Sequence, residues 1–194
     1  MSAFDAWLFD LDGTLTEPTH DFAAIKAELG LPPDRDVLSG ILTKPETERS
    51  GLLEAVRAWE ADHLERARPA RGAPELLDRL AHAGLPVGIV TRNTRVTARA
   101  TLEIIGLAHH FPEGVVYGRD DAMPKPAPDA LLALLQRFAV SASRAVMVGD
   151  HDHDLLAGRA AGATAVWVDP AGTGEFASRA DVIVRGLDEL LERV

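Results

Sequence analysis

Short apolar runs recur along the chain and are separated by longer stretches in which apolar residues have helical spacing. Apolar runs that end at turn-forming residues are typical of buried strands. The runs expected to form strands are 6–9, 85–90, 115–117, 145–148, 163–168 and, at an edge of the sheet, 182–184. Helical patterns cover 74–83, 94–105, 128–138, 152–161 and 186–194. Because strands that alternate with helices form parallel sheets, we predict an α/β protein with a three-layer, Rossmann-like parallel sheet core.

The segment between the first two strands has a different pattern. From 17 to 71 the apolar residues form stripes at helical spacing, and no strand-like run interrupts them. We therefore predict a small all-helical cap domain over 17–71, inserted after the first strand. The core domain then consists of 1–16 and 72–194. Pro18 and the segment 69–72 lie at the two junctions, and we interpret them as hinges.

A cap of about 55 residues has the size needed to exclude water from a site on the core. Such a lid leaves little room for a protein chain as substrate. The cap therefore predicts a small substrate. The side chains expected to set its selectivity are His20, Arg35, Arg49 and Arg57.

Composition narrows the class of protein. The formal net charge of −10 argues against binding nucleic acid or an anionic membrane through bulk electrostatics. The absence of cysteine excludes disulfides, thiolate catalysis and zinc–thiolate sites. No apolar stretch reaches transmembrane length, and the first apolar run is too short for a signal peptide. We expect a cytoplasmic protein.

Reactive residues follow the expected strands. Asp10-Leu11-Asp12-Gly13-Thr14-Leu15 comes directly after the first strand. Thr91-Arg92-Asn93, Met123-Pro124-Lys125-Pro126 and Gly149-Asp150-His151-Asp152-His153-Asp154 follow later strands. The carboxyl ends of parallel strands share one edge of the sheet, where ligands bind. Asp10, Asp12, Thr91, Lys125, Asp150 and Asp154 should therefore converge there.

Lysine usage gives a separate argument for Lys125. The chain has 17 arginines and three lysines, and Lys125 stands between two prolines that restrict its backbone. A lysine kept and fixed in an arginine-rich chain suits a site that needs a compact positive charge. We interpret Lys125 as stabilising phosphoryl charge.

The four motifs together resemble those of the haloacid dehalogenase-like hydrolase superfamily, in its phosphoglycolate-phosphatase-like branch. The resemblance covers nearly the whole chain and implies a phosphatase acting on a small phosphate monoester through an aspartyl-phosphate. It implies that Asp10 is the nucleophile, and that Asp12 protonates the leaving oxygen and later activates water. It further implies that Thr91 donates its hydroxyl to the phosphate. We expect the backbone amides at Arg92 and Asn93 to face the phosphate as well, with Asn93 capping the next helix.

Carboxylates dominate the expected metal site. The resemblance implies that Asp10, the backbone carbonyl of Asp12, and Asp150 ligate a cation. Asp154 is expected to support Lys125 or a metal-bound water from outside the ligand set. An all-oxygen site of this kind favours Mg²⁺.

Histidine ligation is a weaker interpretation of the His-Asp-His-Asp run, because Leu155 and Leu156 stand where a histidine metal motif would continue with an acid and a third histidine. His151 departs from the family pattern, since many relatives have a small hydroxyl residue there. The remaining histidines are expected to be solvated or packed: His20, His63, His82, His109 and His110.

Alternative functions remain open within this pattern. A phosphomutase of the same family would need cap residues that hold a bisphosphate intermediate. A non-catalytic phosphate-binding regulator would not need to keep the nucleophile, acid and metal ligands together. Dehalogenation uses one nucleophilic aspartate without a metal, so the presence of Asp12, Lys125 and Asp150 argues against it.

Overall fold

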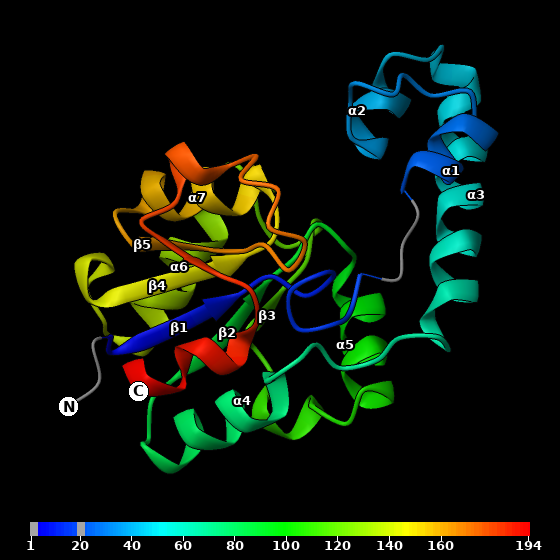
Figure 1. Ribbon diagram of the computed structural model, residues 1–194. Coiled ribbons are helices and arrows are strands. Elements are labelled where there is room, and N and C mark those ends of the chain that lie inside the picture. Colours follow the sequence, from blue (N-terminus) through cyan, green and yellow to red (C-terminus); the bar gives the residue numbers. More distant parts are fainter. Residues whose placement is uncertain (1–3, 19–21) are drawn as a thin grey trace. The chain divides into compact units, whose positions relative to one another are not determined.

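A computed structural model describes residues 4–18 and 22–194 (Figure 1). The chain forms two compact units. One consists of Met1–Pro18 and Ala67–Val194, and the other of Thr19–Arg66. Within the described residues, no helix has the length and apolar content to cross a membrane.

The larger unit is built on a six-stranded sheet in which every pairing is parallel. The order is β3-β2-β1-β4-β5-β6. All four residues of β1 are buried, as expected for a strand covered on both faces. The strands are β1 (Ala6–Phe9), β2 (Val87–Val90), β3 (Val116–Tyr117), β4 (Ala145–Gly149), β5 (Thr164–Val168) and β6 (Val182–Val184). The predicted α/β class and parallel sheet are confirmed.

The helices cover both faces of this sheet (Figure 1). Right-handed crossovers place helices on opposite faces when the chain moves across the sheet in opposite directions. α4 (Ala73–His82) and α5 (Arg95–Ile104) lead from β1 towards β3, whereas α6 (Asp129–Phe138) and α7 (Asp152–Ala161) lead back towards β5. The chain reverses direction between β1 and β4. In open α/β sheets that point is where ligands bind.

The end of the chain differs from the prediction. The sequence pattern predicts a helix over 186–194, whereas the structure has a 3₁₀ helix, η4 (Leu187–Arg193). Leu187 and Leu190 are both fully buried, against α4 and the sheet. A 3₁₀ helix has three residues per turn, so this spacing brings both leucines to one face.

The smaller unit contains three helices, α1 (Phe22–Glu28), α2 (Val37–Leu42) and α3 (Glu46–Leu64). Its own small core consists of Leu31, Ile41 and Val56. Leu29, Val37, Leu52 and Leu53 pack against that core. This part of the chain is helical, as the apolar stripes predicted.

The two connections to the helical unit pair with each other on the core side. Thr16 and Pro69 form an antiparallel bridge. Glu17 N donates to Arg68 O at 2.9 Å, and Ala70 N donates to Leu15 O at 2.8 Å. The residues from 67 onwards therefore belong to the larger unit, a few residues before the predicted boundary at 71. These backbone bonds tie part of the expected hinge segment 69–72 to the core.

Candidate active site

The acids of the first and last motifs lie beside each other at the carboxyl edge of the sheet. β1 and β4 are neighbours, and Asp10 and Asp150 follow them directly. Asp10 N donates to Val148 O at 2.9 Å, which continues the ladder to the strand end. Thr91 follows β2, the other neighbour of β1, and its N–H donates to Tyr117 O at 3.0 Å. Parallel pairing therefore brings these three motifs to one edge.

Lys125 is buried at this edge, between two carboxylates. Its Nζ donates to Asp10 Oδ1 and to Asp154 Oδ1, each at 2.5 Å. Only 3% of Lys125 is exposed. A lysine almost never occupies so buried a place without charged partners. The lysine therefore joins the first motif to the fourth.

Asp154 also receives a bond from the backbone. His151 N donates to Asp154 Oδ2 at 3.0 Å, while His153 N donates to His151 Nδ1 at 3.3 Å. This is a capping box at the start of α7, with a histidine in the place of the usual hydroxyl residue. His151 thus performs the capping that a small hydroxyl residue would perform.

Asp150 is held by two residues that the sequence did not single out. Thr14 Oγ1 donates to Asp150 Oδ1 at 3.3 Å. Trp167 Nε1, from β5, donates to the carbonyl of Asp150 at 3.0 Å. Thr14 belongs to the first motif, and Trp167 lies within the apolar strand β5, so neither had a separate polar signal. They fix both the backbone and the carboxylate of Asp150.

Asn93 holds the carboxylate of Asp12. Its Nδ2 donates to Asp12 Oδ2 at 3.0 Å, and its backbone N donates to Thr91 Oγ1 at 3.0 Å. The expectation that Asn93 caps the next helix is wrong, because the cap is Thr94, whose Oγ1 accepts from Thr97 N at 3.1 Å. The sequence does indicate this cap, because threonine is a favoured N-cap residue and Thr94 directly precedes the first helical residue.

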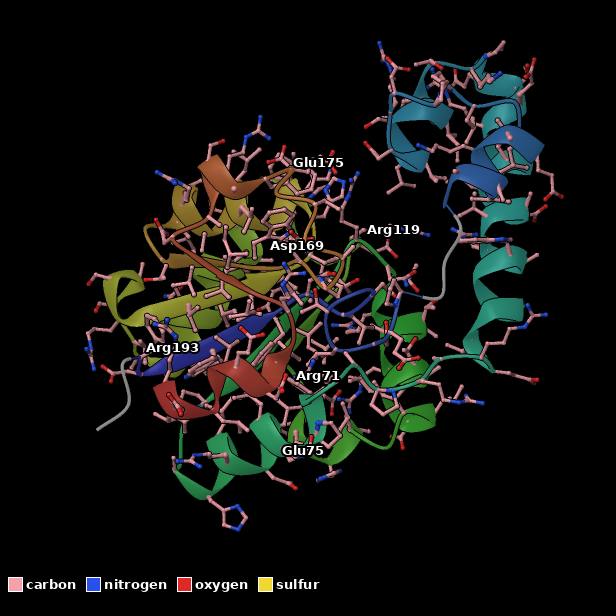
Figure 2. All side chains as sticks on the ribbon, viewed as in Figure 1. Arg71, Glu75, Arg119, Asp169, Glu175 and Arg193 are labelled. Carbon is pink, nitrogen blue, oxygen red and sulfur yellow. The ribbon has the colours of Figure 1, made fainter. Side chains whose placement is uncertain are left out.

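The loops around this edge carry further charged residues. Figure 2 shows Arg119 and Asp169 at the end of the sheet where the strands terminate. Arg119 Nη1 donates to the carbonyl of Arg92 at 3.4 Å. Asp169 follows β5 and accepts from Thr173 N and Gly174 N, each at 3.0 Å. The hydrogen bonds of the Asp169 carboxylate therefore stay within the loop that follows β5. A phosphate contact by Arg92 stays a prediction.

Electrostatics at this edge disfavour so many ionised carboxylates. Burial raises the pKa of Asp10 well above its usual range, Lys125 opposes this, and the neighbouring acids raise it further. Burial and the charge of Asp154 raise the pKa of Asp150 to about 7. Burial alone would lower the pKa of Lys125, but Asp10 and Asp154 outweigh it and hold the lysine charged. The site has more negative charge than its lysine neutralises.

A divalent cation fits this arrangement. Carboxylate oxygens of Asp10, Asp150 and Asp154 all lie within 4.8 Å of one another. Gly13 leaves the space beside them open, because a Cβ there would lie 2.4 Å from Asp150 Oδ2. Hard oxygen donors in excess of positive charge are what Mg²⁺ and similar cations require. Both oxygens of Asp154 already accept bonds, from Lys125 and His151, so Asp10 and Asp150 are the better placed side-chain ligands.

Replacing Gly13 by alanine should damage this site beyond the cost of backbone strain. Gly13 has φ +84°, and Gly84 has φ +68° with no neighbouring atom within 4 Å of the place that a methyl group would occupy. Alanine in the left-handed region costs about 1–2 kcal/mol at either place. Gly13→Ala must also displace Asp150, so we expect a larger loss of stability and weaker Mg²⁺ binding. Urea unfolding and Mg²⁺ titration of Gly13→Ala and of Gly84→Ala, the matched control, measure these losses. Equal losses of stability and of Mg²⁺ binding in the two variants would contradict the prediction.

Comparison with known proteins identifies the family. The sequence model described as haloacid dehalogenase-like hydrolase matches residues 25–168. The chain belongs to this family. It is 33% identical to a phosphoglycolate phosphatase of Xanthomonas campestris, over 96% of this chain and 95% of that protein. It is 34% identical to the probable phosphatase IndB of Dickeya dadantii, over 83% and 79% of the two chains.

Other similar proteins support the same family. An N-acetylmuramic acid 6-phosphate phosphatase of Pseudomonas aeruginosa is 32% identical, over 96% of this chain and 93% of that protein. Among solved structures, a hydrolase from Pseudomonas syringae has a TM-score of 0.82 at 24% identity, covering 97% of this chain and 96% of that one. The structural likeness confirms the fold that the haloacid dehalogenase-like family implied.

Proposed function

We propose that this haloacid dehalogenase-like protein is a phosphatase that hydrolyses a small phosphate monoester through a phosphorylated Asp10. The observation that carries the proposal is the contact of Lys125 with both Asp10 and Asp154 at the strand ends. This contact joins a carboxylate nucleophile to a fixed positive charge at the point where the chain reverses across the sheet. Curated relatives with phosphatase names support the reaction class.

In the first half of the reaction, a carboxylate oxygen of Asp10 attacks phosphorus, and the bond from phosphorus to the leaving oxygen breaks. Asp12 gives its proton to that oxygen. The bond from Asn93 Nδ2 to Asp12 Oδ2 keeps the Asp12 carboxyl in one orientation. In the second half, Asp12 takes a proton from water, the water oxygen bonds to phosphorus, and the bond to Asp10 breaks. Phosphate leaves and both aspartates are restored.

The phosphoryl oxygens need donors that are in place before the reaction. Thr91 Oγ1 accepts the Asn93 N–H, so its own hydroxyl hydrogen points to another acceptor. We assign that acceptor to a phosphate oxygen. Lys125 lies beside Asp10, so its ammonium group meets negative charge that develops on the transferring phosphoryl group.

Asp10, Asp150 and the backbone carbonyl of Asp12 would hold the metal ion, and the donor set favours Mg²⁺. When bound, the ion neutralises phosphate charge and aligns the ester with the nucleophile. Asp154 would act by holding Lys125, since its oxygens already accept bonds from Lys125 and from the His151 amide.

The metal requirement has a measurable pH dependence. Chelation should abolish hydrolysis of an aryl phosphate, Mg²⁺ should restore it, and Ca²⁺ should restore it poorly because its coordination is larger and looser. The pKa of about 7 for Asp150 means that a proton competes with the metal below pH 7. The Mg²⁺ concentration for half-maximal activity should therefore rise by at least about tenfold for each pH unit below 7. Full activity in chelator would contradict the metal role.

Substrate size is the second part of the proposal. Relatives are named for phosphoglycolate, N-acetylmuramic acid 6-phosphate and validoxylamine A 7′-phosphate, which are small esters. The helical unit, proposed as a cap, would select among such substrates through Arg35, Arg49 or Arg57; His20 lies outside the described residues. A panel of sugar, glycolate and nucleotide phosphates should outperform phosphopeptides. Faster turnover of phosphopeptides than of every small ester would refute this part alone.

A further inference from the structure

Three side chains of the kind that bind metals meet on the larger unit, apart from the carboxylates of the active site. Asp78 lies on α4, and His109 and His110 lie on the short 3₁₀ helix η1 (Ala108–His110). One ligand atom from each lies within 4.8 Å of the other two. A helix that joins parallel strands returns the chain to their amino ends. η1, which follows α5, is therefore at the edge of the sheet opposite the active site.

The backbone holds the two histidines firmly. Leu107 and Phe111, on either side of η1, are 3% and 0% exposed. His110 N donates to Leu107 O and Phe111 N donates to Ala108 O, each at 3.1 Å. Arg99 Nη1 donates to the carbonyl of Phe111. Two buried anchors and three bonds thus fix where the imidazoles are presented.

The spacing of the ligand atoms suits a small tetrahedral ion. His110 Nε2 lies 3.4 Å from Asp78 Oδ1. Bonds of about 2.0–2.1 Å to a tetrahedral Zn²⁺ place the ligand atoms about 3.3 Å apart. The His109 and His110 rings are inclined at 40° with centroids 4.0 Å apart. The ligand atoms of Asp78, His109 and His110 all lie within 4.8 Å of one another, so His109 would supply the third ligand.

Ordinary packing explains this group poorly. The Asp78 carboxylate is 63% exposed, and water solvates it without help from a histidine. The His110 side chain is only 5% exposed, yet its Nε2 faces the Asp78 carboxylate. A neutral imidazole is the form that binds a metal.

We propose that Asp78, His109 and His110 bind a divalent cation of the zinc class and thereby cross-link α4 to η1. Two imidazoles and one carboxylate match the ligand preference of Zn²⁺ and differ from the all-oxygen set at the sheet edge, which suits Mg²⁺. Three protein ligands leave a fourth position for water. His109 is exposed and the His110 side chain is buried, as expected of solvated or packed histidines, and the proposed site gives both a further role.

The test uses Zn²⁺ as the probe and exposed residues as targets. Isothermal titration of the full chain in excess Mg²⁺, repeated in an Asp150→Asn background, separates this site from the acids of the active site. We expect Asp78→Asn and His109→Gln each to weaken Zn²⁺ binding by at least about tenfold. His82→Gln is the matched control. His82 is exposed, lies one turn from Asp78 on α4, and stands outside the three-residue group.

A stability measurement gives a second readout. Zn²⁺ should raise the melting temperature of the wild-type protein and of His82→Gln, but not that of Asp78→Asn or His109→Gln, since a ligand stabilises the state that binds it. Zn²⁺ binding of equal strength in all four proteins, or no binding by the wild type, would overturn the proposal. Neither result depends on phosphatase activity, so the proposed function is tested separately.

Discussion

Asp10→Asn should reduce phosphate ester hydrolysis to the background rate and prevent any phosphorylated enzyme from forming. The amide has the same shape, so it preserves the packing at the end of β1, but it is not a nucleophile at neutral pH. Asp12→Asn should slow turnover by about 10²–10⁴-fold, which is the usual contribution of a general acid and base to the rate. Its amide oxygen still accepts the bond from Asn93 Nδ2, so binding of inorganic phosphate should persist.

Rapid quench and phosphate binding distinguish the two variants. Asp10→Asn should give no trapped acyl-phosphate, whereas Asp12→Asn should form it slowly and hydrolyse it slowly. Asp169→Asn is the matched control, because Asp169 is a buried acid at the same sheet edge whose oxygens accept only from its own loop. Its turnover per folded molecule should stay within a few-fold of wild type. Near-normal turnover by Asp10→Asn would end the case for nucleophilic catalysis.

The sequence predicted the strands well for a physical reason. A strand in a parallel sheet is buried on both faces, so it appears as an uninterrupted apolar run such as 6–9 or 145–148. The residues after these runs are polar because the sheet ends there. Topology then brings them together, and this is why the positions of Asp10, Thr91 and Asp150 could be predicted from strand ends alone.

The hydrogen-bond partners of the side chains could not be predicted from the sequence in the same way. Thr14 and Asp150 are 136 residues apart in the chain, and only the neighbouring positions of β1 and β4 bring them into contact. Trp167 reads as part of an apolar strand, although its indole N–H supports the carbonyl of Asp150. The same limit applies to Asp78 and His110, which lie on separate elements and carry no shared motif.

The terminal helix shows a different limit. Apolar positions at 187, 190 and 191 fit both an α-helical and a 3₁₀ spacing. Packing against α4 decided between them, and no local residue carried that information. Local pattern therefore predicted which elements exist, while tertiary contacts decided their detailed geometry and the pairing of their side chains.

Lys125→Met should cause the second large loss, in both activity and stability. The methylenes of methionine fill the same volume, but Asp10 and Asp154 are left buried without their positive partner. Breaking a buried ion pair by removing one member costs about 3–5 kcal/mol. Loss of the positive charge beside the transferring phosphoryl group should slow turnover by about 10²–10³-fold.

A double-mutant cycle separates these two effects. Asp154→Asn leaves Lys125 paired with Asp10, so it should destabilise the protein less than Lys125→Met does. The double variant lacks Lys125 and also one of the two carboxylates that lose their positive partner. Its loss of stability should therefore be smaller than the sum of the single losses. Lys44→Met, which replaces a half-buried lysine of the helical unit, is the matched control and should leave turnover unchanged.

Mg²⁺ provides the decisive comparison for Lys125→Met. A cation held by Asp10 and Asp150 neutralises part of the charge that the lysine leaves behind, so added Mg²⁺ should recover part of the lost stability. It should not recover turnover, because a cation among the carboxylates does not occupy the position of the ammonium group beside Asp10. If Lys125→Met kept wild-type turnover, or if the cycle with Asp154→Asn were strictly additive, the lysine would be a packing residue and not part of the catalytic machinery.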